Sequence, residues 1–82
     1  MPPRKPNPIH RTEYTAFRAV LSQMRRNAGL TFRGLAAKMD RPVTWVHKCE
    51  AGLRRMDVPE FLEWCDACGV GFARAARMLK NH

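Results

Sequence analysis

With 82 residues and 45% hydrophobic content, the chain can form one small domain, and its length excludes a larger organisation. No apolar run approaches the roughly 20 residues that span a bilayer, so we expect no membrane segment. The start of the chain lacks the apolar region of a secretory signal, and the three cysteines are an odd number. A reduced, cytoplasmic compartment is therefore the simplest expectation.

Positive charge is concentrated in the first two thirds of the chain. The net charge is +8, from 15 Lys and Arg against 7 Asp and Glu. Residues 1–56 contain 12 basic and 3 acidic residues, whereas residues 57–82 contain 3 basic and 4 acidic residues. This asymmetry favours a face that binds a polyanion over a small basic protein with a uniformly solvated surface.

Residues 1–11, MPPRKPNPIHR, contain four prolines and three Lys or Arg residues. Each proline lacks an amide hydrogen and disfavours helical geometry in the residue before it. We expect a flexible, basic, Pro-rich arm here, with a leader that has no function as an equal alternative. The folded domain is expected over residues 12–82.

Two helices are predicted in the next part of the chain. The first runs from Thr12 to Asn27, because apolar residues recur at spacings of three and four and Gly29 follows. Its inward residues are Tyr14, Phe17, Leu21, Met24 and Ala28. The second runs from Phe32 to Met39, with Thr31 as its N-cap. Its inward residues are Leu35, Ala36 and Met39.

A third helix is predicted over residues 42–51, between a break at Asp40-Arg41 and a stop at Gly52. Pro42 suits its first turn, where the missing amide hydrogen would be unpaired anyway. The spacing places two groups on opposite faces, Val46, Cys49 and Glu50 against Val43, Thr44, His47 and Lys48. The second face is therefore expected to expose a methyl surface, a hydroxyl, an imidazole and an ammonium group.

The remaining sequence predicts two more helices. Asp57-Val58-Pro59-Glu60 has the pattern of a capping box, and Gly69 ends the fourth helix. Its expected core residues are Phe61, Leu62, Cys65 and Cys68, and its expected solvated residues are Glu60, Glu63 and Asp66. The fifth covers residues 72–80, with Ala73, Ala76 and Leu79 inward. No strand-like alternation occurs, so the predicted fold class is all-α with five helices.

The second and third helices, joined by a turn of about four residues, have the form of a helix-turn-helix. Residues 30–70, LTFRGLAAKMDRPVTWVHKCEAGLRRMDVPEFLEWCDACGV, resemble the Cro/lambda-repressor-type (Xre-like) family. That family reads Leu-Thr-Gln-x-x-Leu-Ala, and then a helix ending in Ile-Glu-x-Gly. With the preceding helix, the resemblance covers nearly everything except the arm. It implies a five-helix lambda-repressor-like bundle whose third helix lies in the major groove of DNA.

Several residues depart from the family pattern. Phe32 and Val43 stand where glutamines are common, and His47 replaces a common serine. Asp40 occupies the position of the usual turn glycine, which is tolerable because Asp can adopt left-handed geometry. These departures leave the expected fold unchanged. They do not predict which DNA sequence is bound, because Val43 offers only a methyl surface.

Side-chain chemistry suggests how such a domain would bind DNA. For base readout we expect Val43 on a thymine methyl, Thr44 at a base edge and Lys48 at guanine, with His47 as a further donor or a phosphate contact. The expected phosphate contacts are Thr31, Phe32, Arg33, Arg41, Trp45, Arg54 and Arg55. A packing role is an equal alternative for Trp45. An ordinary exposed residue is a lesser alternative for His47 and Arg33.

Metal, redox and catalytic chemistry are poorly supported. Cys65 and Cys68 form a Cys-x-x-Cys pair, but within a helix rather than at loop knuckles, so we expect core packing. The sequence lacks a phosphate-binding loop, a nucleophile elbow and paired catalytic carboxylates. We therefore expect no metal, no cofactor and no enzymatic activity.

The leading hypothesis is a sequence-specific regulator of transcription, most simply a repressor, of bacterial or phage type that binds double-stranded DNA. Because one helix reads few base pairs, family members usually bind palindromic operators as homodimers. The candidate dimer residues are Phe72, Met78 and Leu79, with core closure as their alternative.

A second hypothesis is a protein-interaction module, an antitoxin or anti-regulator that binds a protein partner. Val43, Trp45 and Phe32 motivate it, because they are apolar where polar residues are usual and exposed aromatic groups suit protein interfaces. The charge of residues 1–56 favours DNA instead. A nonspecific nucleic-acid binder is a weaker third hypothesis.

Overall fold

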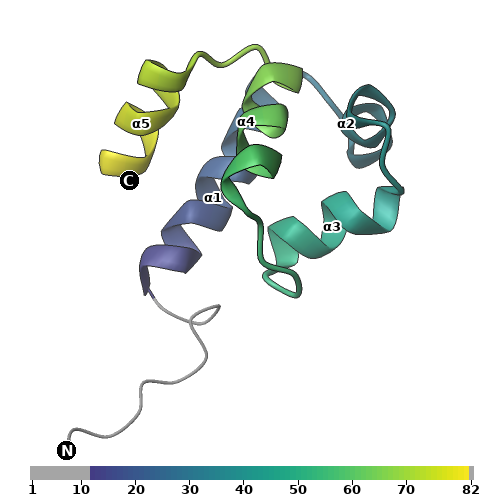
Figure 1. The fold of residues 1–82 in the computed structure, drawn as a ribbon, viewed down its shortest axis with the longest axis horizontal. Coiled ribbons are helices and arrows are strands. Elements are labelled where there is room, and N and C mark those ends of the chain that lie inside the picture. Colours follow the sequence, from purple (N-terminus) through teal and green to yellow (C-terminus); the bar gives the residue numbers. More distant parts are fainter. Residues whose placement is uncertain (1–11, 82) are drawn as a thin grey trace, which may run out of the picture.

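The computed structural model describes residues 12–81, which form five α-helices and, within that range, no strand (Figure 1). The helices are α1 (Thr12–Asn27), α2 (Phe32–Met39), α3 (Val43–Ala51), α4 (Val58–Ala67) and α5 (Phe72–Lys80). The all-α prediction is confirmed. The predicted arm, residues 1–11, lies outside the described residues. None of the described helices has the length and apolar character that crossing a membrane requires.

The helices α1 and α4 form the centre of the fold, with α2 and α3 on one side and α5 on the other (Figure 1). The indole N–H of Trp64 in α4 donates to the carbonyl of Leu21 in α1 at 3.2 Å. Phe17 and Phe61 pack between the same helices, with ring centroids 5.3 Å apart. This centre leaves one side of α3 facing away from the core.

Burial along α1 is wider than the sequence predicted. Leu21 and Met24 are fully buried, whereas Ala28 is exposed. Val20, which was not predicted, is also buried. The reason is that α1 packs against both α3 and α5, so that two flanks of the helix are covered rather than one stripe.

The core residues predicted for α4 and α5 differ in part from those that the structure buries. Trp64 is the largest fully buried side chain, although it was not predicted, and Leu62 is exposed. Residues 61, 64, 65 and 68 form the inward stripe at helical spacing, and position 62 lies off it. In α5 the buried alanine is Ala75, whereas Ala73 and Ala76 are exposed.

Local capping explains where the helices begin and end. Thr31 accepts a hydrogen bond from the Gly34 N–H at 3.0 Å and caps α2, as predicted. Asp40 ends α2 in the left-handed conformation, with φ 54°. Pro42 is the extended N-cap of α3 rather than its first helical residue, so the predicted start is one residue early. These signals set the length of the helix-turn-helix.

Candidate nucleic-acid interface

One face of α3 is exposed along its whole length. Val43, Thr44, His47 and Lys48 are all exposed, whereas Val46 and Cys49 are buried. Residues at these spacings share one side of a helix, so the four predicted base-reading residues lie together on one strip. The division of α3 into two faces is confirmed.

An ion pair between Arg25 and Glu50 joins α3 to α1. Arg25 Nε donates to Glu50 Oε2 at 2.6 Å, and Arg25 Nη2 donates to Glu50 Oε1 at 3.2 Å. Both side chains are mostly buried, at 12% and 8% exposure. Arg25 Nη1 also donates to the Leu30 carbonyl at 2.9 Å. Such two-pronged geometry restricts orientation, so this pair holds α3 at a defined angle to α1.

The end of α3 is covered by Arg18. Gly52 ends the helix with φ +77°, and Arg18 Nη1 donates to the Glu50 carbonyl at 3.3 Å. A Cβ atom at position 52 would lie 2.8 Å from guanidinium atoms of Arg18. The left-handed backbone therefore favours glycine here, and a side chain at this position would also displace the guanidinium of Arg18.

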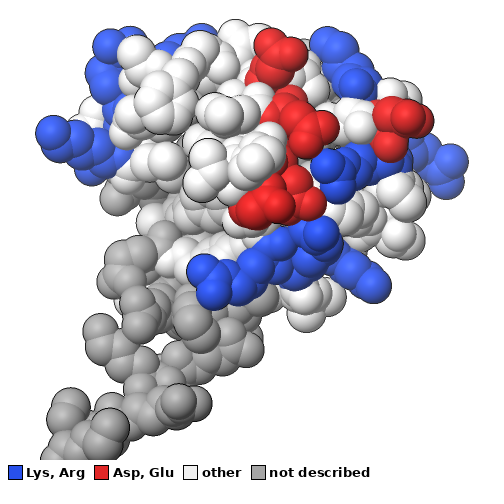
Figure 2. All heavy atoms as spheres, viewed as in Figure 1, with Lys and Arg blue, Asp and Glu red and all other residues white. Residues whose placement is uncertain are grey.

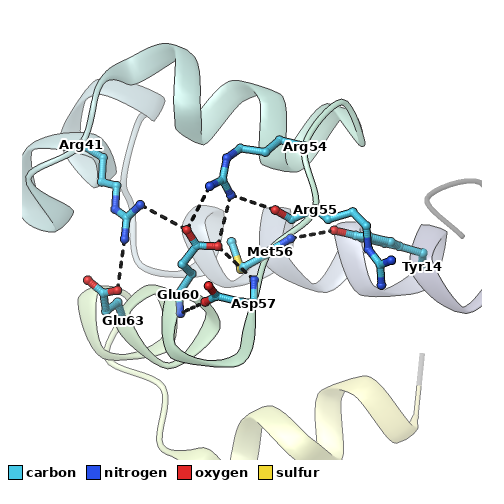
Figure 3. A network of polar contacts seen from close by, with 8 residues as sticks. All are labelled: Tyr14, Arg41, Arg54, Arg55, Met56, Asp57, Glu60 and Glu63. Carbon is cyan, nitrogen blue, oxygen red and sulfur yellow. Dashed lines mark hydrogen bonds and ion pairs between the residues drawn. The ribbon is translucent and has the colours of Figure 1, made fainter.

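A second polar network lies between the turn before α3, the loop after it, and α4 (Figure 3). Arg54 donates to both carboxylate oxygens of Glu60 at 3.1 Å. Arg41 donates to Glu60 at 3.3 Å and to Glu63 at 3.2 Å. Figure 2 shows a band of acidic side chains over α4, with Lys and Arg beside it and a further acidic group apart from the band. The two arginines thus fasten both ends of α3 to α4.

Glu60 corrects the expectation of a solvated position. It is buried, at 9% exposure, whereas Glu63 and Asp66 are exposed as predicted. Glu60 also completes the predicted capping box: its N–H donates to Asp57 Oδ1 at 2.8 Å, and it accepts from the Asp57 N–H at 2.9 Å. One carboxylate therefore serves the helix cap and two arginines.

The surroundings of Glu60 keep it ionised. Burial by itself would raise its pKa, but the hydrogen bonds from Arg54 and the Asp57 backbone, with the charges of Arg54 and Arg41, lower the pKa below its usual range. In return, the hydrogen bond to Glu60 raises the pKa of Arg54. The network therefore persists at neutral pH.

The four arginines among the predicted phosphate contacts fall into two groups. Arg33 and Arg55 are exposed, near opposite ends of the helix-turn-helix in sequence. Arg41 and Arg54 are partly buried and already bonded to acidic side chains. Thr31 is exposed, and its hydroxyl accepts the cap hydrogen bond. Arg33 and Arg55 are thus the arginines that the structure leaves most accessible among the four.

Trp45 and Phe32 are less accessible than the sequence suggested. Trp45 is 8% exposed, and its ring centroid lies 6.1 Å from that of Trp64. Arg41 Cζ lies 4.3 Å from the ring centroid of Trp45. The structure therefore supports the packing alternative for Trp45 rather than a phosphate contact. Phe32 is half-buried between Arg25 and His47.

Two residues near the exposed strip were missed by sequence reasoning. Arg26 and Ser22 line a hollow of about 270 Å³ together with Phe32, His47, Glu50 and Ala51. Arg26 lies one turn after Ser22 on a side of α1 away from the predicted core residues. That spacing was visible in the sequence, but only the packing of α1 on α3 brings Arg26 beside His47.

The cysteines are free thiols in the core. Cys49, Cys65 and Cys68 are all buried, which confirms the packing prediction. Burial raises the pKa of Cys49 and of Cys68 to about 11, so both remain protonated at neutral pH. Over residues 12–81, no group of three or more His, Cys, Asp or Glu residues is arranged to hold a metal ion.

Comparison with known proteins places this geometry in a family. Residues 16–78 match the family model of the helix-turn-helix domain. A solved XRE-family like protein from Pseudomonas syringae pv. tomato str. DC3000 is similar, with 36% identity and a TM-score of 0.78 over 89% of this chain and 91% of that chain. The search of curated proteins gives no match. The chain therefore belongs to the Xre-like helix-turn-helix family of DNA-binding regulators.

Proposed function

We propose that this protein is a sequence-specific transcriptional repressor of bacterial or phage type that inserts α3 into the major groove of double-stranded DNA. The observation that carries the proposal is the exposed strip of α3, residues 43, 44, 47 and 48, on a helix held at both ends by ion pairs. Rigid presentation matters because base contacts discriminate only when side chains meet the groove in a fixed register.

The side chains of the strip suggest how bases are read. Thr44 can donate to or accept from a base edge, and Lys48 can donate to guanine O6 or N7. Val43, at 36% exposure, can pack on a thymine methyl. Arg33 and Arg55 are proposed to contact phosphates, which position the helix without reading sequence.

Arg41 and Arg54 are less available to DNA phosphates than Arg33 and Arg55 are. Both are already bonded to Glu60 or Glu63, so a phosphate has to share these guanidinium groups with a carboxylate or replace it. The Arg41–Glu63 bond is the easiest to exchange, because the Glu63 side chain is 51% exposed. We therefore propose Arg33 and Arg55 as the principal clamps and Arg41 as an auxiliary one.

A homodimer on a palindromic operator is part of the proposal. Among the three candidate dimer residues, Phe72 is 67% exposed, whereas Met78 and Leu79 are half-buried against the core. We expect Phe72→Asp to leave the fold intact and to weaken both self-association and operator binding. Sedimentation and operator titration of the variant provide the test. An unchanged mass and affinity would remove Phe72 from the dimer surface.

The protein-interaction alternative loses part of its support. Of the three apolar residues that motivated it, Trp45 is buried, Phe32 is half-buried and only Val43 is exposed. We therefore do not propose an antitoxin or anti-regulator role, and the absence of DNA binding in the test below would favour it. A cytoplasmic location and the lack of enzymatic activity remain expectations that accompany the regulator role.

The test is selection of bound duplexes from a random double-stranded DNA library at about 150 mM salt, where nonspecific binding is weak. We expect one palindrome to be enriched. The matched control is Lys48→Ala, which should bind with a relaxed preference at one position of each half-site. Binding without enrichment would indicate a nonspecific binder, and the absence of binding would favour a protein partner.

A further inference from the structure

Phe32 and His47 form a ring contact that joins the first residue of α2 to the exposed strip of α3. Their ring centroids are 5.4 Å apart and their planes are 84° from parallel. This is the edge-to-face arrangement that aromatic rings prefer. His47 is exposed, so the contact leaves much of its ring accessible to a ligand.

Phe32 is itself held in place. The guanidinium carbon of Arg25 lies 4.3 Å from the centroid of the Phe32 ring. Arg25 is fixed in turn by its bonds to Glu50 and to the Leu30 carbonyl. The contacts therefore form a continuous path from Glu50 in α3, through Arg25 in α1 and Phe32 in α2, to His47 in α3.

The open space around His47 makes the contact with Phe32 important for the orientation of the His47 ring. The hollow of about 270 Å³ beside α3 is lined by His47 and Phe32 and also by Ser22, Arg26 and Glu50. A histidine with this much room can adopt more than one rotamer. The contact with Phe32 selects one of them. An edge-to-face pair of this kind favours its rotamer by about 2- to 10-fold over orientations that lack it.

We propose that Phe32 is a positioning residue for His47, and that the pair determines the preference for one base pair in each half-site. This inference rests on the proposed function, since it assigns a specificity role within the same interface. It also gives Phe32 a role other than the phosphate contact expected from the sequence.

The first arm of the test needs no DNA. The ring current of Phe32 should displace the NMR signals of the His47 ring protons. We expect that displacement to be lost in Phe32→Leu, which keeps an apolar side chain, and retained in Phe32→Tyr, which keeps the ring. Identical His47 shifts in Phe32→Leu and the unmodified protein would overturn the contact and the proposal with it.

The second arm repeats the duplex selection with variants. Phe32→Leu should lose about 2- to 10-fold of the preference at one position, the same position that His47→Ala affects. The double variant should lose no more than His47→Ala alone, because both changes remove one interaction. Phe32→Tyr, which keeps the ring, should retain the preference of the unmodified protein. The control Arg33→Ala should weaken binding to all sequences by a common factor.

The outcomes separate the two proposals. A protein that selects a site, with the same preference in Phe32→Leu, would overturn the positioning role alone. A uniform loss of affinity in Phe32→Leu would do the same, since it would indicate a structural or phosphate-contacting residue. An unmodified protein that selects no duplex would overturn the proposed function, and the specificity role with it, whatever the NMR signals show.

Discussion

Two polar junctions hold α3, and they differ in burial and in the number of partners. Arg25 and Glu50 form a mostly buried, two-pronged pair between α1 and α3. At the other junction, Glu60 is shared by Arg41 and Arg54, and Arg41 also bonds the exposed Glu63. A buried pair cannot exchange its partner for water, whereas an exposed one can.

The difference suggests a division of roles. The junction with α1 sets the orientation of α3, because breaking it would leave a charge buried. The junction with α4 contains one bond, from Arg41 to Glu63, that a DNA phosphate could replace at little cost in stability. A DNA-binding domain needs both properties, a fixed helix and cations that remain available.

Glu50→Gln should be the most damaging change to stability. It leaves the Arg25 guanidinium in a mostly buried position without its counter-charge, which costs about 3–5 kcal/mol in the free energy of unfolding. Chemical denaturation measures the loss. The control is Glu63→Gln, which removes an exposed pair and should cost less than about 1 kcal/mol. Equal losses in the two variants would contradict the division of roles.

Gly52→Ala should destabilise the protein more than Gly69→Ala does. Both glycines have positive φ, +77° and +71°, so both changes incur the strain of about 1–2 kcal/mol for a left-handed alanine. Only position 52 adds a close approach, because its Cβ would lie 2.8 Å from the Arg18 guanidinium. Denaturant unfolding of both variants gives the difference. In an Arg18→Ala background the two costs should become equal, and a persistent difference would rule out the contact as its cause.

Acid should weaken the α4 junction through Glu60. Because the pKa of Glu60 is lowered in the folded protein, the unfolded chain takes up the proton first as the pH falls. The stability that this carboxylate contributes is therefore fully present above its usual pKa of about 4.3 and is lost as the pH falls below that value. Unfolding free energies measured from neutral pH to about pH 3 should decrease less steeply in Glu60→Gln than in the unmodified protein.

The smallest expected effect concerns the exchangeable bond. Glu63→Gln frees Arg41 from one partner and should increase DNA affinity slightly, with a steeper dependence on salt. Asp66→Asn is the matched control, since it removes the same charge from an exposed position of the same helix. Titration of a selected operator at several salt concentrations compares them. The same increase in both variants would attribute the effect to general charge rather than to Arg41.

The helix-turn-helix and the start of α4 were largely predictable because their signals are local. The cap at Thr31, the left-handed Asp40 and the Asp57–Glu60 box each involve residues within a few positions of one another. Such interactions form whenever the chain makes a helix, whatever surrounds it. The exposed strip of α3 was predictable for the same reason, since helical spacing alone separates it from Val46 and Cys49.

The errors concern residues whose surroundings come from distant parts of the chain. Ala73, Ala75 and Ala76 have identical side chains, so only the packing of α5 decides that Ala75 is the buried one. Glu60 was expected in solvent because it is acidic. It is buried because Arg41 and Arg54, from the two ends of α3, meet above α4 and supply its counter-charges.

The helices, the caps at Thr31 and Asp57, the motif and its exposed face were therefore readable from the sequence, because each depends on contacts within a turn or two. The packing of the helices against one another determined which arginines are bonded to acidic side chains and which stay accessible. It also decided that Trp45 packs in the core and that Phe32 meets His47. These outcomes require helices from different parts of the chain to meet, and burial and charge pairing are set by that meeting.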